Sequence, residues 1–299
     1  LIKYIPHTIT TGFTSGIAVT IIVGQLKDFF GLTFSHTPVE TVDKVKEVVA
    51  SFSTVNLMAV LVGIVSLLIL VFLPKLLPKI PASLIAVILM AVLVKLFDLD
   101  VNTIGTLYPD IPTGLPRFTL PKFELSSVVA LIPDAFTIAI LAGVESLLSC
   151  VVADKMINSK HNSNMELVAQ GVGNIGSALF GGIPATGAIA RTAANIKNGG
   201  RTPVSGMIHS VVLLAVLAVF MPYTNLIPMP TIAAILFVVA YNMSEMKEFA
   251  GIVRHDAKTD ALVLIVTFVF TVVFDLVVAI AVGLALHYLI VLIKKIGSR

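Results

Sequence analysis

Long apolar runs recur from one end of the chain to the other, separated by short polar, glycine-rich or proline-rich breaks. A helix needs about 20 mostly apolar residues to cross the hydrocarbon of a bilayer. Because lipid cannot satisfy backbone hydrogen bonds, runs of this kind predict helices that span a membrane. Hydrophobic residues make up 57% of the chain and charged residues 12%, whereas about a quarter of the residues in soluble domains are charged. The sequence therefore predicts an all-α polytopic membrane protein embedded in the lipid bilayer.

The breaks between the apolar runs define the expected helices. These are Pro6–Phe30, Asn56–Leu73, Ala82–Phe97, Pro133–Val152, Leu167–Phe180, Gly187–Ile196, Pro203–Met221, Pro230–Tyr241, Ala261–Phe274 and Leu276–Ile293. Several of them are too short to cross a membrane alone. Asp275 interrupts the last apolar stretch, so we expect two helices to meet at this aspartate.

Two other stretches do not fit a membrane span. In 39–49, VETVDKVKEVV, the valines recur on one helical face with charges opposite, which predicts a short amphipathic helix in the membrane interface. The stretch 113–123, TGLPRFTLPKF, is rich in proline and glycine, and it predicts a short extended segment or a loop.

The placement of lysine and arginine predicts the orientation, since basic residues are more frequent on the cytoplasmic side of a membrane. When the segments are threaded alternately through the bilayer, most of the 20 lysines and arginines fall on the side of the carboxyl terminus. We therefore expect a cytoplasmic carboxyl terminus and a location in the cell inner (plasma) membrane, with Arg191 left inside the bilayer. The net charge of +3 is small and its basic residues are dispersed, which argues against a nucleic-acid partner.

The segment 180–203, FGGIPATGAIARTAANIKNGGRTP, predicts a broken helix. Its glycines and prolines prevent a continuous helix, and residues 187–196 can form about three turns before Gly199. The first N–H groups of such a half-helix have no intrahelical partner and carry about half a positive charge, which favours an anion. Arg191, one turn into this half-helix, adds a full positive charge. The alternative is a re-entrant turn packed through its glycines, with Arg191 reaching a carboxylate or the interface.

Glu145 is a lone charged residue within the apolar run 135–153. A carboxylate near the middle of a span costs about 2.5–3.5 kcal/mol on insertion scales, so such residues are usually retained for function. Helical spacing places Ala142, Glu145 and Ser149 on one face. We interpret Glu145, with Ser149 one turn later, as a proton carrier or a sodium site. The alternatives are a hydrogen bond of the neutral acid, or an ion pair with Arg191 that locks two helices together.

The other polar residues in apolar segments carry weaker signals. His209 and His287 are single imidazoles, which fit packing better than ligation. No cysteine and histidine cluster has metal-ligand spacing, and no serine has a recognisable base. We therefore expect neither an enzyme nor a metal site, and no cofactor other than Na⁺ or H⁺ as a coupling ion.

Glycines recur at helical spacing in two of the apolar segments. Gly12 and Gly16 form a G-x-x-x-G pair, and Gly171, Gly173 and Gly176 line a second segment. Because glycine lets helix backbones approach closely, both sets predict tight helix packing.

Four blocks of the sequence, in the same order along the chain, resemble the SulP (sulfate permease) family of anion transporters. They are VESLLSCVVADKM from residue 144, NMELVAQGVGNIGSALFGG from 164, GGIPATGAIARTAANIKNGGRTPVSG from 181 and FDLVVAIAVG from 274. The likeness covers essentially the whole chain.

The resemblance implies an inverted-repeat transporter fold with a core and a gate domain, of which this chain holds a part. On that scheme residues 1–124 are gate-domain helices of the first repeat with a connecting loop. Residues 125–225 are core-domain helices, including the broken half-helix at 187–196, and residues 226–299 are gate-domain helices of the second repeat. Roughly the first four segments of the fold and the family's cytoplasmic STAS domain would lie outside this chain.

The resemblance also implies the residues of the site. The substrate-binding positions are Thr186, Gly187, Ala188, Ile189, Ala190 and Arg191. The coupling position falls on Glu145, with Ser149 one turn later. Ala190 is apolar where some relatives have a hydroxyl group, so the family's selectivity cannot be copied across.

Together these features predict secondary active transport of a small anion of the sulfate, bicarbonate or dicarboxylate class. Coupling to protons or sodium, an elevator-like movement of the core and a homodimer are expected with it. An uncoupled channel or exchanger is one alternative, because a positive helix end can bind an anion whether or not its movement is coupled to a cation. A nucleobase transporter of similar fold is another, but it would need more hydrogen-bonding side chains than Ala188, Ile189 and Ala190 supply.

Overall fold

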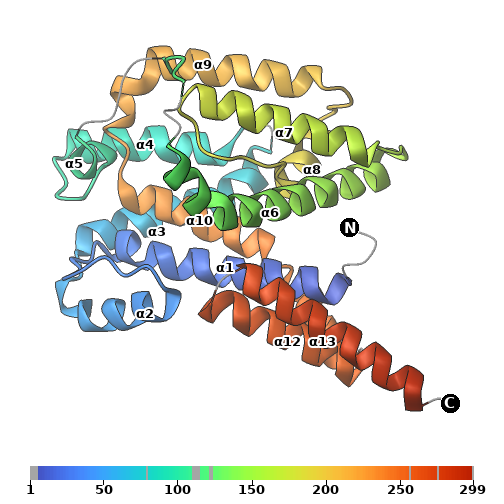
Figure 1. Ribbon diagram of the computed structural model, residues 1–299. Helices are drawn as coiled ribbons and strands as arrows, with labels where there is room; N and C mark the ends of the chain where they lie inside the picture. The colour runs from blue at the N-terminus through green and yellow to red at the C-terminus, as the bar shows by residue number, and fades with distance from the viewer. Residues whose placement is uncertain are drawn as a thin grey trace. The chain divides into compact units, whose positions relative to one another are not determined.

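The computed structural model describes residues 6–78, 80–109, 115–120, 124–255, 257–274 and 276–297. Helices are the regular elements of this described part, and an isolated antiparallel bridge joins Thr103 to Pro228 (Figure 1). In chain order the α-helices are α1 (His7–Phe30), α2 (Thr41–Ala50), α3 (Leu57–Leu76), α4 (Ala82–Leu96), α5 (Ile104–Leu107), α6 (Leu125–Ile157), α7 (Ser163–Leu179), α8 (Ile189–Lys197), α9 (Val204–Thr224), α10 (Met229–Met243), α11 (Met246–His255), α12 (Lys258–Val273) and α13 (Leu276–Gly297).

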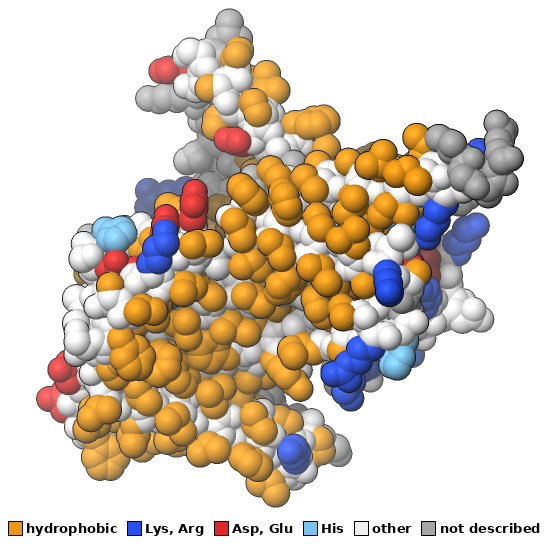
Figure 2. Space-filling model, turned by 90° about the horizontal axis from the view of Figure 1, so that it is seen from below, with side chains coloured by type: hydrophobic (Ala, Val, Ile, Leu, Met, Phe, Trp, Pro, Cys, Tyr) orange, Lys and Arg blue, Asp and Glu red, His pale blue; other side chains and the backbone are white. Residues whose placement is uncertain are grey.

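Six helical stretches of the described residues are long and apolar enough to cross a membrane. They are His7–Phe30, Leu57–Leu76, Ser126–Ile157, Val204–Thr224, Met229–His255 and Val278–Lys295. Many of their large apolar side chains are exposed, and Figure 2 shows hydrophobic side chains over most of one face. Since water would disfavour such a surface, these helices face lipid, and the predicted all-α multi-pass class is confirmed.

A helix is present in every predicted apolar run, but several details of the prediction were wrong. The helix α6 begins at Leu125 instead of Pro133, because the proline is accommodated within a helix that the apolar residues 125–132 already start. The helix α11 was not predicted, since its charged residues resemble a loop. Its apolar side is packed, however, with Phe249 against Phe268 at 5.3 Å between ring centroids. The predicted joint at Asp275 lies outside the described residues.

The two non-spanning stretches have the local structure that the sequence predicts. Helix α2 confirms a short helix within 39–49, with Val48 buried and the other valines exposed; its location in the interface stays a prediction. Of the stretch 113–123, residues 115–120 are described and have no regular structure. The Thr119 N–H donates a hydrogen bond to the Leu179 carbonyl across 2.8 Å. This bond ties the extended stretch to the end of α7.

The chain divides into two compact units. One unit is Thr113–Phe220, and the other combines Ile5–Pro112 with Met221–Arg299. The first unit contains α6, α7, α8 and most of α9, and the candidate site lies within it.

In the second unit, α1 packs against both α10 and α12 (Figure 1). A Cβ atom added at Gly12 would lie 2.6 Å from the Leu264 carbonyl oxygen. One added at Gly16 would lie 2.6 Å from the Thr271 Cβ. Both distances are shorter than any ordinary contact, so the predicted close packing at this glycine pair is confirmed.

Buried hydroxyl groups add hydrogen bonds between helices of the same unit. Ser66 on α3 and Thr231 on α10 share a hydrogen bond of 2.9 Å between their side-chain oxygens, and both residues are fully buried. Ser15 on α1 donates its hydroxyl to the Ser244 carbonyl at the end of α10 across 2.6 Å. Such bonds join membrane helices because lipid offers the hydroxyl groups no alternative partner.

Candidate functional site

An extended segment interrupts the helical path between α7 and α8. Helix α7 ends at Leu179, and Gly181 follows in the left-handed region with φ 71°, which glycine adopts without strain. Residues 182–188 have no regular secondary structure, and α8 starts at Ile189 after Ala188, whose backbone is extended with φ −86° and ψ 120°. The predicted broken helix is therefore present. Its helical part begins two residues later than predicted, because Gly187 and Ala188 belong to the extended segment.

Polar side chains of α7 hold this extended segment by its main chain. The Asn174 amide makes two hydrogen bonds with Ala185: its Oδ1 accepts from the N–H at 2.7 Å and its Nδ2 donates to the carbonyl at 3.0 Å. Gln170 Nε2 also donates to the Ala185 carbonyl. Near the start of the segment, Ser177 donates its hydroxyl to the Ile183 carbonyl across 2.9 Å. These bonds replace the ladder that an extended segment would have inside a sheet.

Helix α6 contacts the other end of the segment and the first turn of α8. The Thr186 hydroxyl donates to the Ala142 carbonyl across 2.8 Å, and the Gly187 N–H donates to Ser146 Oγ across 3.3 Å. One turn further on, Ser149 donates to Thr192 Oγ1 on α8 across 2.7 Å. Ser146 and Ser149 are both buried. Ser149 on α6 therefore contacts the half-helix α8 directly.

The start of α8 carries backbone N–H groups without a side-chain cap. Ala188, at the position before the helix, has no side chain that could accept from them, and no cap hydrogen bond is present there. Ile189, Ala190 and Arg191 make up the first three helical residues, so their amides are the unpartnered donors of the helix end. The Arg191 side chain is exposed, and the Ala190 side chain lies outside the described atoms.

Glu145 lies on α6 immediately before Ser146 and is partly buried. Helical geometry places it beside the face formed by Ala142, Ser146 and Ser149, which contacts the segment and α8. Within the described part of the chain, no hydrogen bond or ion pair joins Glu145 to Arg191. The interpretation of these two residues as a helix lock therefore finds no support in the geometry.

The three α7 residues that hold the segment, and with them Ser146 and Thr192, were not among the predicted site residues. Within α7, close packing was predicted at Gly171, Gly173 and Gly176, but a Cβ atom added at any of these three would meet nothing within 4 Å. The packing prediction for these glycines is thus wrong for the described chain. The missed signal was the spacing of Gln170, Asn174 and Ser177, which places three polar residues on one face of an otherwise apolar helix.

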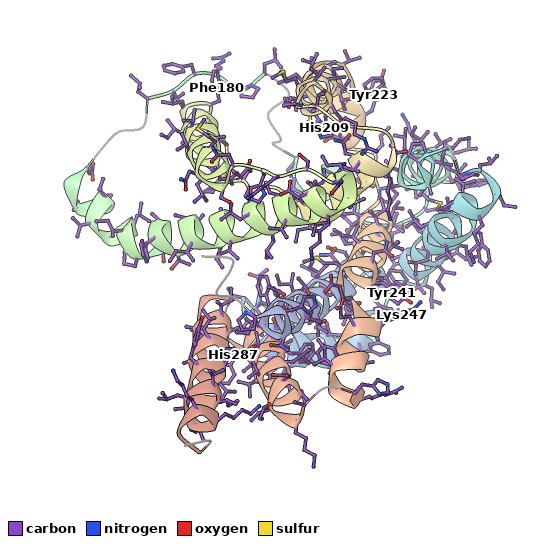
Figure 3. All side chains as sticks on the ribbon, turned by 90° about the vertical axis from the view of Figure 1, so that its right-hand side faces the viewer. Phe180, His209, Tyr223, Tyr241, Lys247 and His287 are labelled. Carbon is purple, nitrogen blue, oxygen red and sulfur yellow. The ribbon has the colours of Figure 1, made fainter. Side chains whose placement is uncertain are left out.

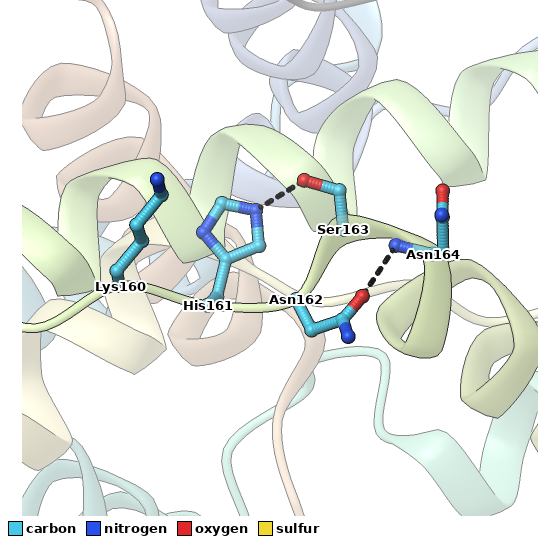
Figure 4. Close-up of a pocket in the computed structure, with 5 residues that line it drawn as sticks. All are labelled: Lys160, His161, Asn162, Ser163 and Asn164. Carbon is cyan, nitrogen blue, oxygen red and sulfur yellow. Dashed lines mark hydrogen bonds between the residues drawn. The ribbon is translucent and has the colours of Figure 1, made fainter.

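Two other polar features lie away from this site. A surface hollow of about 350 Å³ is lined by residues 160–164 in the α6–α7 connection (Figure 4). There His161 is hydrogen-bonded to Asp154 through Nδ1 at 2.7 Å and to Ser163 through Nε2 at 2.9 Å. The Asn162 side chain accepts hydrogen bonds from the first amides of α7. The polar groups around this hollow therefore cap a helix and hold a loop in place.

The two histidines noted in the sequence also lie elsewhere, on α9 and α13 (Figure 3). His209 is exposed, so the packing role expected for it is not present in the described chain. The His287 ring packs edge-on against Tyr288, with 5.5 Å between ring centroids.

A discontinuous helix held by polar side chains of its neighbouring helices, within a polytopic bundle of apolar helices, is typical of membrane transporters. The protein-family comparison agrees: the model described as "Sulfate permease family" matches residues 1–267. The chain therefore belongs to the sulfate permease family. Members of this family are transporters and not enzymes, as the sequence predicts.

Curated relatives in bacteria are similar over nearly the whole chain. The "Putative sulfate transporter YvdB" of Bacillus subtilis (strain 168) is 45% identical over 289 residues, which cover 96% of this chain and 54% of that protein. The "Bicarbonate transporter BicA" of Synechocystis sp. (strain ATCC 27184 / PCC 6803 / Kazusa) is 34% identical over 287 residues, covering 94% and 50%. The chain thus spans about half the length of the curated relatives it matches.

Solved structures share the fold. The transmembrane domain of a cyanobacterial bicarbonate transporter BicA matches with a TM-score of 0.77 and 31% identity, over 93% of this chain and 69% of that one. The structure of SLC26A9 matches with a TM-score of 0.85 over 97% of this chain and 47% of that one, and at 22% identity it shows the fold alone. The predicted transporter fold, present in part, is confirmed by these matches.

Proposed function

We propose that the protein containing this chain moves a small anion of the sulfate, bicarbonate or dicarboxylate class across the inner (plasma) membrane by secondary active transport. The observation that carries this proposal is the start of α8. The first amides of α8 follow the segment before the helix and have no side-chain cap. The Arg191 side chain lies in the same first turn. In a site walled off from water, such a helix end attracts an anion. Of the relatives, one is named a putative sulfate transporter and another a bicarbonate transporter, and these names support an oxyanion as the substrate.

Glu145 is the proposed coupling residue, with Ser149 one turn later. A partly buried carboxylate beside buried hydroxyl groups can bind a proton, or it can supply an oxygen ligand to Na⁺. Negative charge at Glu145 would repel an anion at α8, and a bound H⁺ or Na⁺ would remove that repulsion. Binding of the cation and the anion is therefore mutually favourable in this proposal, which is the basis of symport.

Residues 125–225 are proposed to move as the core against a gate formed by 1–124 and 226–299, carrying the site across the bilayer. The carboxyl terminus is proposed to be cytoplasmic, on the basis of the lysine and arginine distribution. We further propose a homodimer, which light scattering of the purified protein would measure directly.

Uptake by the full-length protein in liposomes tests the proposal. Sulfate, bicarbonate, succinate and chloride are offered in turn, with and without an inward Na⁺ or H⁺ gradient. Accumulation above equilibrium that needs one of the gradients supports symport. Anion flux that only runs downhill would instead indicate an uncoupled channel or exchanger. Uptake of uracil in place of any anion would identify a nucleobase transporter.

A further inference from the structure

The segment before α8 depends on side chains for its backbone hydrogen bonds. Among the described residues, Ala185 is bonded at both its N–H and its carbonyl group by α7, and Gly187 is bonded at its N–H by α6. In a bilayer, a backbone group that loses such a partner has no water to replace it. The positions of Ala185 and Gly187 are therefore coupled to the side chains that bond them.

The directions of these hydrogen bonds follow from the main chain. The Ala185 N–H needs an acceptor and its carbonyl needs a donor, which determines the orientation of the Asn174 amide. Gln170 also directs its Nε2 to the Ala185 carbonyl, so its Oε1 is the atom that faces Ser146. The Ser146 hydroxyl donates its single proton to Gln170 Oε1 across 3.1 Å.

Ser146 Oγ is then left with lone pairs toward α8, and it accepts the Gly187 N–H at 3.3 Å. The approach is close, because a Cβ atom added at Gly187 would lie 3.1 Å from Ser146 Oγ. The Gly187 N–H therefore already has a hydrogen-bond acceptor in the protein and is not available to an anion. The free donors of the helix end are the amides of Ile189, Ala190 and Arg191.

We propose that Gln170 and Asn174 are positioning residues of the anion site. Both fix Ala185 directly, and Gln170, through Ser146, also fixes the Gly187 amide, so that the anion meets the amides of Ile189, Ala190 and Arg191. Neither residue needs to touch the anion. This inference rests on the proposed function, since it concerns the same helix end.

Substitution of Gln170 by Glu tests the inference with little change of shape. An ionised glutamate cannot donate to the Ala185 carbonyl, so two oxygen atoms face one another. We expect anion affinity about tenfold below the wild type at about pH 7.5. At about pH 5.5 a desolvated carboxyl group is protonated and can donate again, so the affinity returns to within about twofold of the wild type. The measurement is equilibrium binding of sulfate and of chloride, which keep their charge throughout this pH range.

Two variants serve as controls, and each is compared with the wild type at the same pH. Gln170→Leu lacks both hydrogen-bonding groups, so its loss of affinity should not depend on pH. Ser177→Ala removes a bond to the same segment at Ile183, remote from α8, and it should change the affinity less than about twofold. If Gln170→Leu does not fold, Gln170→Met replaces it, since it also lacks both hydrogen-bonding groups and its loss of affinity should likewise not depend on pH.

The outcomes separate this inference from the function on which it rests. Recovery of Gln170→Glu at low pH, together with a loss in Gln170→Leu that does not depend on pH, supports positioning through the Ala185 carbonyl. A loss in Gln170→Glu with none in Gln170→Leu would assign the effect to the added negative charge and would overturn the inference. Equal losses in both variants at every pH, or no loss in either, would overturn the inference. A wild-type protein that at about pH 7.5 binds none of sulfate, bicarbonate, succinate and chloride would instead refute the proposed anion site.

Discussion

The hydroxyl group of Ser149 on α6 donates a hydrogen bond to Thr192 Oγ1 on α8 across 2.7 Å. The two residues are 43 positions apart in the chain, and the bond joins the helix that carries Glu145 to the first turns of the half-helix. An anion at the start of α8 and a cation at Glu145 would therefore share one rigid support.

A double-mutant cycle on this pair should show coupling. Ser149→Ala and Thr192→Val should each lower the free energy of unfolding, and the coupling energy should be about 1 kcal/mol, as for an ordinary buried hydrogen bond. Thermal unfolding of the purified protein provides the measurement. Ser210→Ala is the control, because that hydroxyl only bonds the Gly206 carbonyl within exposed α9. Additive single effects would show that the Ser149–Thr192 bond contributes nothing.

Replacement of Glu145 by Gln should abolish gradient-driven accumulation of the anion while leaving anion binding partly intact. The amide is neutral and cannot take up a proton, and it is a weaker ligand for Na⁺ than a carboxylate. Liposome uptake with and without the gradient measures the effect. Asp134→Asn, an exposed carboxylate on the same helix, should accumulate anion as the wild type does. Normal accumulation by Glu145→Gln would remove the coupling role.

Arg191→Ala should weaken anion binding by about 5- to 50-fold, in line with the loss of one charge-assisted interaction. Arg191→Lys keeps the charge and should retain part of the affinity. Lys197→Ala removes a charge at the opposite end of α8 and should have little effect. Binding assays on detergent-purified protein are sufficient. Unchanged affinity in Arg191→Ala would assign the arginine to the protein surface.

Gly12→Ala should destabilise the protein by about 1–3 kcal/mol, because the added methyl group must displace the Leu264 carbonyl or separate α1 from α12. Gly24→Ala on the same helix has no neighbour within 4 Å of the new atom. It should leave stability unchanged or raise it by up to about 1 kcal/mol through helix propensity. Thermal unfolding of the two variants side by side measures the difference. Equal effects would show that α1 and α12 do not pack closely.

Glu47 should make stability depend on pH. Hydrogen bonds from the Ser35 hydroxyl and amide, both 2.7 Å from Glu47 Oε1, lower the pKa of this carboxyl below its ordinary value of 4.5. His36 Nδ1, 3.3 Å from Oε2, adds to the stabilisation when it is protonated. A lowered pKa in the folded state means that the contribution to stability is present above pH 4.5 and is lost as the pH falls through the folded value.

Glu47→Gln should therefore be less stable than the wild type at neutral pH, and the gap should close as the pH falls below 4.5. Melting temperatures measured across this range give the comparison. Asp43→Asn removes only an exposed pair with Lys46 and should have little effect at any pH. A constant gap between wild type and Glu47→Gln would show that the carboxylate is not held as described.

Much of the architecture can be read from the order of the residues, because membrane helices are specified by local hydropathy. The apolar runs located the helices, and the glycines and prolines between Phe180 and Gly187 predicted the break before α8. Residue spacing also identified the close approach at Gly12 and Gly16. In each case the pattern that predicts the feature lies within a few residues of the sequence, or it reflects the lipid, which surrounds every span alike.

The partners of the broken segment could not be read in this way. Ala185 is bonded by Gln170 and Asn174, which precede it by 15 and 11 positions, and Gly187 by Ser146, 41 positions away. Those pairings depend on how α6 and α7 lie against the extended chain. Hydropathy does not encode that arrangement, because a polar side chain in an apolar helix has the same local pattern whichever backbone group it bonds. Only the folded chain shows which amides are already used and which remain at the start of α8.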